Sequence, residues 1–172
     1  MLTPSERWSW TYCAQRDRLL LDISEQLQFC SELSAAQLTE KPQAKPLSMA
    51  EAQAFWNFRD SLQPLNLTDA GLLELCLHAL AAGFAQQAGH KSWYFAEQAA
   101  AAVAEYQLVQ LVGMHGPIPA LVLQRDGDCA SCLLLTEGYS LSGKLLKRCS
   151  ILRLLSNRLA PVRPSQYFAQ SA

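Results

Sequence analysis

Apolar and polar residues alternate over the first thirty positions of the chain with the two-residue period of a β-strand. Residues 8–12 place three aromatic side chains on one face of such a strand and two hydroxyl side chains on the other. Residues 18–23 and 27–33 are two further strand-like segments, and polar residues typical of turns separate all three. The pattern predicts an antiparallel meander of three short strands.

A change to helical periodicity follows a polar loop, residues 34–47, that contains two prolines. Ser48 and Glu51 have the spacing of a capping box, in which the side chain of each residue accepts a hydrogen bond from the backbone N–H of the other. They predict a helix that begins at residue 48 and continues to about Leu62. Pro64 ends this helix because proline lacks a backbone N–H and its ring clashes with the preceding turn.

A second helix is predicted from its N-cap Thr68 to Phe84. Its apolar residues nearly encircle the axis, which is typical of a helix at the centre of a core. After Gly89 the pattern becomes strand-like, and turn signals separate the segments. Short strands are predicted for residues 91–95, 106–112, 120–124, 132–135 and 139–146. A final amphipathic helix is predicted over residues 149–159, with Pro161 after it.

Together these elements predict an α+β fold in two parts. Residues 1–89 form an N-terminal α/β domain of antiparallel strands and two helices, and residues 90–172 form a mostly β domain, a small sheet or barrel, that ends in a helix. A chain of 172 residues is long enough for one medium domain or two small ones with a shared interface. Half of its residues are hydrophobic and 17% are charged, which excludes a globally disordered protein.

Charge is distributed unevenly along the chain. Residues 1–112 carry seven basic and twelve acidic side chains, whereas residues 113–172 carry seven basic and three acidic ones. This asymmetry is typical of a basic face for an anionic partner, although an ordinary solvated surface explains the same counts. The sequence has neither a signal peptide nor an apolar run that could span a bilayer. We therefore expect a soluble cytoplasmic protein with no membrane partner and with its six cysteines mostly reduced.

Cys129 and Cys132 form a CxxC motif, the best candidate for metal or redox chemistry. A tetrahedral zinc site needs four ligands, and the sequence has no second pair at a matching spacing. A redox CxxC of the thioredoxin kind precedes a helix, whereas strand-like residues follow Cys132. No catalytic triad or phosphate-binding loop is evident either. We therefore predict a protein-binding protein without catalytic residues, metal or cofactor, with a CxxC metal-binding or redox protein as the alternative.

Nucleic-acid binding is a third hypothesis. It rests on a group of basic residues close together in the sequence, namely Lys144, Lys147, Arg148, Arg153 and Arg158. Aromatic residues are not interleaved with them, and the isoelectric point of about 6.3 is low for such a role. We therefore expect no nucleic-acid partner.

Aromatic residues offer a different kind of binding surface, because four tryptophans are many for a chain of this length. A strand face with Trp8, Trp10 and Tyr12 over a helix that carries Phe55 and Phe58 leaves an apolar groove suited to a peptide. Burial of these side chains in a core explains the same pattern.

The order of several blocks along the chain resembles the family of the cell-division protein ZapC. The blocks are W-S-W-T-Y, D-R-L-L-L-D-I, K-S-W-Y-F, C-L-L-L and S-N-R-L-A-P, and the resemblance is strongest over residues 8–33, 72–95 and 131–162. It implies an α/β domain followed by a twisted β-barrel-like domain. It also implies a cytoplasmic adaptor at the mid-cell division site, which binds the tubulin-like protein FtsZ, promotes lateral association of its filaments and stabilises the Z ring. Neither catalysis nor a cofactor is implied.

The resemblance suggests an apolar pocket in the first part and a basic surface in the second. The C-terminal tail of FtsZ, a short peptide with acidic and apolar residues, needs both. By motif position, the expected charged contacts are Lys91, Lys144 and Arg158. The apolar residues expected to line a pocket or support the core are Trp8, Trp10, Leu21, Phe55 and Trp93. Filaments can be crosslinked by a monomer with two sites or by a weak homodimer with one site each.

Overall fold

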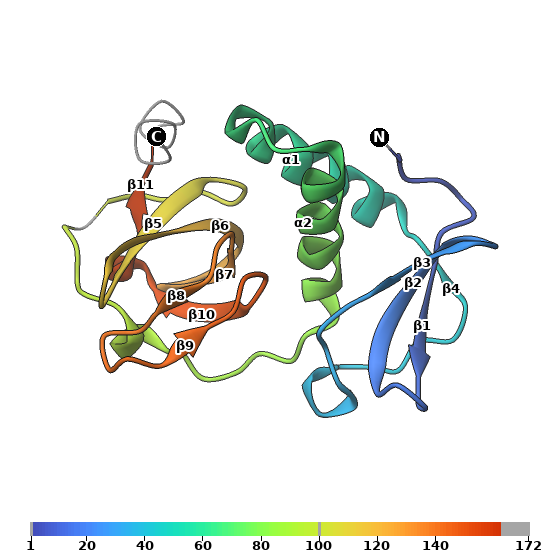
Figure 1. The fold of residues 1–172 in the computed structure, drawn as a ribbon, viewed down its shortest axis with the longest axis horizontal. Coiled ribbons are helices and arrows are strands. Elements are labelled where there is room, and N and C mark those ends of the chain that lie inside the picture. The colour runs from blue at the N-terminus through green and yellow to red at the C-terminus, as the bar shows by residue number, and fades with distance from the viewer. Residues whose placement is uncertain (1, 100, 163–172) are drawn as a thin grey trace. The chain divides into compact units, whose positions relative to one another are not determined.

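The computed structural model describes residues 2–99 and 101–162, which divide into two compact units (Figure 1). The first unit combines the residues up to Asp60 with Thr68–Gln86, and the second combines Ser61–Leu67 with the described residues from Gln87 onward. Two α-helices and antiparallel sheets make up the described chain, so the mixed α+β class is confirmed. The predicted domain boundary at residue 89 stays a prediction.

The sheet of the first unit has four antiparallel strands in the order β3-β2-β1-β4. Its strands are β1 (Ser9–Cys13), β2 (Arg18–Ser24), β3 (Leu27–Cys30) and the short edge strand β4 (Lys45–Pro46). Strands β1 to β3 form the predicted meander, with Trp10 opposite Leu21 in the register. The structure adds β4, a strand that the polar composition of the loop did not indicate.

Both predicted α-helices are present as α1 (Met49–Leu62) and α2 (Asp69–Ala81). The capping box at the start of α1 is formed: the Ser48 hydroxyl accepts from the backbone N–H of Glu51 at 3.0 Å, and the Glu51 carboxylate accepts from that of Ser48 at 3.3 Å. The second carboxylate oxygen of Glu51 accepts a hydrogen bond from the indole N–H of Trp10, which ties this helix start to β1. Neither helix is both long enough and apolar enough to cross a membrane.

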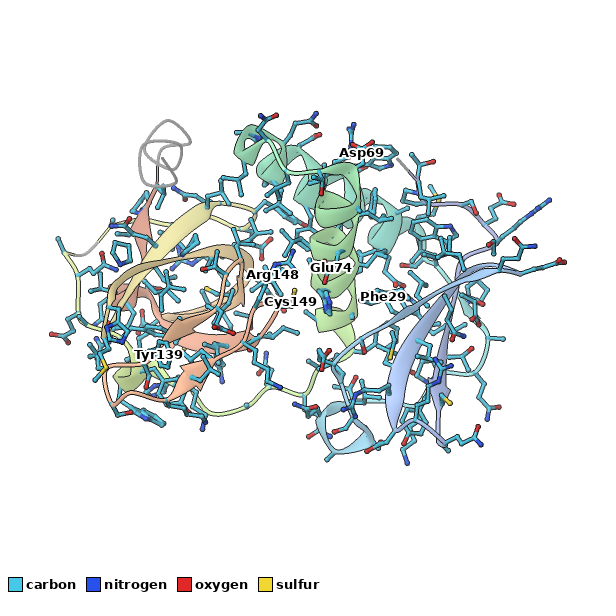
Figure 2. The ribbon with its side chains drawn as sticks, viewed as in Figure 1. Phe29, Asp69, Glu74, Tyr139, Arg148 and Cys149 are labelled. Atoms are coloured by element: carbon cyan, nitrogen blue, oxygen red, sulfur yellow. The ribbon has the colours of Figure 1, made fainter. Side chains whose placement is uncertain are left out.

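The interior of the first unit is aromatic. Trp8 packs edge-on against Phe55 with ring centroids 5.8 Å apart, and Trp10 lies 5.1 Å from Phe84. His78 on α2 is also buried, with the Phe29 ring 4.9 Å away on β3 and the Glu74 carboxylate one turn earlier on the helix (Figure 2). The aromatic face of β1 and the apolar circumference of α2 therefore form the interior of this unit.

The second unit contains a five-stranded antiparallel sheet in the order β10-β7-β6-β5-β11 (Figure 1). Its strands are β5 (Leu108–Gly113), β6 (Gly116–Asp126), β7 (Cys129–Leu134), β10 (Ile151–Leu155) and β11 (Ala160–Pro161). Pro117 and Pro119 lie in the first part of β6, which pairs with β5 but not with β7. The missing N–H of each proline therefore removes no hydrogen bond between β6 and β7. No sheet of the described residues closes into a barrel, and the barrel-like architecture is not confirmed.

The predicted strand over residues 139–146 is wrong as one element. The segment is a small hairpin of β8 (Gly138–Tyr139) and β9 (Leu145–Leu146). Between them the Gly143 N–H donates to the Ser140 carbonyl at 2.9 Å, and Gly143 has a φ of 85°, which closes the turn.

Two further predictions for the second unit are wrong. Residues 149–159 are not a helix: β10 pairs with β7 over its whole length, and a short 3₁₀ turn, Ser156–Arg158, follows it. Cys149, with a φ of 69°, cannot start a right-handed helix. Residues 91–95 are not a strand either but contain the 3₁₀ turn η4 (Ser92–Tyr94). The other 3₁₀ turns are Ala35–Gln37, Gln63–Leu65 and Ala82–Phe84.

Candidate functional site

The turn η4 displays two aromatic side chains on the surface of the second unit. In a 3₁₀ turn, side chains three residues apart lie above one another. Ser92 and Phe95, which have this spacing, are both buried at 1% exposure, whereas Trp93 is 59% exposed and Tyr94 is half-buried. The local geometry therefore turns Trp93 outward while its neighbours anchor the turn.

Three hydrogen bonds fix η4 to segments that are distant in the sequence. The backbone N–H of Lys91 donates to the Arg153 carbonyl, and that of Leu155 donates to the Ser92 hydroxyl, both at 2.8 Å. The Tyr94 carbonyl accepts from the N–H of Leu141 in the loop of the β8–β9 hairpin, also at 2.8 Å. Trp93 is thus presented from a turn that is held on two sides.

Two lysines flank these aromatic rings. The Lys91 ammonium lies 5.3 Å from the centroid of the Trp93 ring, and the Lys144 ammonium donates to the Tyr94 hydroxyl at 3.0 Å. The pKa of Tyr94 is below its ordinary value, mainly because the Lys144 hydrogen bond stabilises the phenolate. Burial opposes this shift, and the charges of Lys144 and Lys91 add to it. We call Lys91, Trp93, Tyr94 and Lys144 the basic–aromatic surface.

This surface has the chemistry of a site for an acidic and apolar ligand. Within residues 2–99 and 101–162, neither Lys91 nor Lys144 has an ion-pair partner. An ammonium has three donors, and Lys144 uses one of them on Tyr94. The remaining donors suit carboxylates, and the exposed Trp93 ring suits an apolar side chain.

Arg158, the third expected charged contact, points into the unit. Its side chain is 15% exposed, and its Nε donates to the Ser92 carbonyl at 2.9 Å. Its Nη1 donates to the Asn157 side chain at 2.7 Å and lies 3.2 Å from the Glu97 carboxylate. The guanidinium therefore anchors η4 through contacts inside the unit.

The expected apolar residues separate into two groups. Four of them, Trp8, Trp10, Leu21 and Phe55, lie in the interior of the first unit with exposures of 0–2%. The groove predicted beside this tryptophan strand is filled by the unit's own side chains. Trp93 alone among the five is exposed, and it lies with Lys91 and Lys144. Tyr94 was missed as a site residue, although it stands inside the K-S-W-Y-F block.

The two cysteines of the CxxC motif lie three residues apart on the single strand β7. Side chains at this spacing point to opposite faces of a sheet, so the two thiols do not converge. Cys132 is fully buried, and burial raises the pKa of its thiol to about 12. In the described part of the chain, no cluster of three or more metal-ligating side chains includes either cysteine. The geometry therefore opposes the metal or redox alternative.

The chain matches two models of one protein family. The model described as cell-division protein ZapC, N-terminal, matches residues 1–87, and the C-terminal model matches residues 89–165. Proteins named cell division protein ZapC are similar over nearly their full lengths. The protein from Pseudoalteromonas translucida is 28% identical, with 94% of each chain covered. That from Aeromonas hydrophila is 28% identical, with 96% of this chain and 97% of the relative covered. The relative from Musicola paradisiaca is 32% identical, with 99% and 95% covered.

Proposed function

The chain belongs to the ZapC family of cell-division proteins, and on this premise we propose that it binds FtsZ in the cytoplasm at mid-cell. Binding promotes lateral association of FtsZ filaments and stabilises the Z ring. The family is one of cell-division factors and is not a known enzyme family.

The observation that carries this proposal is the basic–aromatic surface. A peptide with acidic and apolar residues, such as the FtsZ C-terminal tail, is complementary to the exposed Trp93 ring and to two nearby lysines that lack ion-pair partners in the described chain. Lys91 and Lys144 act as the carboxylate contacts and Trp93 as the apolar anchor. Exposed tryptophan is the kind of residue that dominates the energetics of protein interfaces.

We further propose that the chain works as two domains, residues 1–89 and 90–172, with the tail-binding surface in the second. Lateral association requires two contacts for each bridging unit. A monomer with a second FtsZ contact elsewhere or a weak homodimer supplies them.

Co-sedimentation with FtsZ polymers tests the proposal. We expect the protein to pellet with full-length FtsZ, less as salt rises, and much less with FtsZ that lacks its C-terminal tail. The double variant Lys91→Ala/Lys144→Ala should lose most of this binding.

The first unit offers a matched control. Lys41 and Lys45 lie 5.3 and 5.4 Å from the ring centroids of Tyr12 and Phe84, so Lys41→Ala/Lys45→Ala removes the same charge and the same kind of ring contact, together with the ion pair of Lys45 with Glu40. That variant should pellet like the unchanged protein. No co-sedimentation at low salt would overturn the proposed function.

A further inference from the structure

Exposed apolar side chains gather around the β8–β9 hairpin and the neighbouring β5–β6 turn of the second unit. Met114, on that turn, is 51% exposed, and the hairpin residues Tyr139, Leu141 and Leu145 are 39–45% exposed. The remaining exposed large apolar residues of the described chain, Trp93 apart, are Leu2, Leu27, Met49 and Leu67. Isolated exposure of this kind is ordinary, whereas a contiguous patch marks an interaction site.

Three contacts show that the hairpin residues are contiguous with one another and with η4. The N–H of Leu141 donates to the Tyr94 carbonyl at 2.8 Å, so Leu141 adjoins the basic–aromatic surface. The N–H of Met114 donates to the Tyr139 carbonyl at 3.0 Å. The Met114 Cε lies 3.6 Å from the position that a Cβ on Gly143 would occupy, at the tip of the same hairpin.

The hairpin is held in a fixed position beneath these side chains. A Cβ on Gly113 would clash with the Tyr139 carbonyl oxygen, and one on Gly138 would lie 2.5 Å from a methyl group of Ile118. Ser140 is fully buried, and its hydroxyl accepts from the Lys144 N–H at 3.1 Å. The backbone of the hairpin is therefore pressed onto β5 and β6, while the side chains of Tyr139, Leu141 and Leu145 remain exposed (Figure 2).

The charged side chains that contact the aromatic rings of this patch, Lys91 on Trp93 and Lys144 on Tyr94, are both positive. Lys144 is the sole charged residue between positions 138 and 146, and Lys91 lies beside Trp93. A partner that covers the patch must bring apolar side chains to Met114 and Leu141 and negative charge to the lysines. This combination disfavours a basic or a purely apolar ligand.

We propose that Met114, Tyr139 and Leu141 form an apolar shelf that binds the apolar side chains of the same acidic tail peptide whose carboxylates pair with Lys91 and Lys144. This inference rests on the proposed function and names the second half of its site. The shelf supplies contact area that Trp93 alone does not, and the methionine adapts its shape to the apolar residue it meets.

Titration of a fluorescently labelled FtsZ tail peptide with the full chain, followed by anisotropy, tests the shelf. Met114→Ser/Leu141→Ser should weaken binding at least about fivefold for each anchor removed. The salt dependence should stay as it is, because both lysines remain. Met49→Ser/Leu27→Ser is the matched control, since these residues are 88% and 44% exposed elsewhere, and it should bind like the unchanged protein.

The outcomes separate the shelf from the proposed function. If the unchanged chain binds the peptide and the shelf variant binds it equally well, the shelf is refuted and the function stands. If the substitutions instead leave peptide binding unchanged and alter only the sedimentation coefficient of the chain without peptide, the patch is a contact between copies of this chain. The inference is then also refuted. If no FtsZ species binds, both fail. Met114→Ala, a change at a half-exposed turn residue, repeats the test should the double variant fail to fold.

Discussion

Replacing Arg158 with glutamine distinguishes a residue that contacts the partner from one that supports the contact surface. The side chain donates from Nε to the Ser92 carbonyl and from Nη1 to Asn157, at 2.9 and 2.7 Å. Its charge also lies 3.2 Å from Glu97. Glutamine removes the charge and cannot reproduce both hydrogen bonds.

The expected loss of stability follows from these contacts. A hydrogen bond from a charged donor contributes about 1.5–3 kcal/mol, and the ion pair with Glu97, which is 71% exposed, adds at most about 1 kcal/mol. The Ser92 carbonyl still accepts a hydrogen bond from the N–H of Phe95 at 3.1 Å after the substitution. Losing the bond from Arg158 therefore costs an amount near the lower end of this range. We expect Arg158→Gln to lower the free energy of unfolding of the second unit by about 2–3 kcal/mol in urea titrations.

Binding should respond in a way that a direct charge contact does not. The turn η4 loosens, so affinity for FtsZ falls, but the slope of affinity against salt stays unchanged because Lys91 and Lys144 keep their charges. Iodide quenching should also report a change at Trp93, since the other tryptophans are buried or half-buried. Lys91→Ala should instead reduce the salt slope.

A second arginine of the same unit provides the control. Arg153 pairs with Asp126, which is 56% exposed, at 2.8 Å, and its backbone carbonyl accepts from the N–H of Lys91, a hydrogen bond that a side-chain substitution leaves in place. Arg153→Gln therefore removes one positive charge without loosening the turn. A reduced salt slope in Arg158→Gln with unchanged stability would refute the supporting role and restore Arg158 as a direct contact.

Four further outcomes are expected. Glu51→Ala removes the capping box and the acceptor of the Trp10 indole N–H, and should lower the unfolding free energy in urea by about 2 kcal/mol; a change below about 0.5 kcal/mol contradicts the account. Burial raises the pKa of Cys132 to about 12, so its thiol should resist iodoacetamide in the native protein at pH 8, as mass spectrometry can show. Because that pKa exceeds the unfolded value of about 8.5, its contribution to stability is complete below pH ~8.5 and is lost as pH rises towards 12; thermal unfolding that is unchanged over this range would argue against it. Gly113→Ala places a Cβ against the Tyr139 carbonyl and should cost about 1–3 kcal/mol and weaken tail binding, whereas unchanged affinity and stability would show that the hairpin yields freely.

Local signals were enough to predict strands β1 to β3 and both α-helices, although not the edge strand β4. The alternation that begins at Trp8 gave a strand with a buried face, and Ser48 with Glu51 marked the start of α1. These signals are local, since a cap or a two-residue period needs only neighbouring residues. The sequence could not show that Glu51 also accepts a hydrogen bond from the indole N–H of Trp10, forty-one residues away.

Residues 149–159 illustrate the limit of such signals in the second unit. The run Ile151–Leu155 is apolar with one arginine, a pattern compatible with either a helix or a strand. Pairing with β7 decided the matter, and β7 lies about twenty residues earlier in the chain. Secondary structure there was a consequence of tertiary contact.

The candidate site divides in the same way. Composition and motif order supplied the residue types, and the resemblance supplied Lys91, Lys144 and Arg158 as candidates. Tertiary structure decided the contacts of these side chains, because Lys144 reaches Tyr94 across fifty residues of sequence and Arg158 reaches Ser92 across sixty-six. A side chain that points outward and one that points inward look alike in sequence, since direction depends on partners that only the folded chain brings within hydrogen-bonding distance.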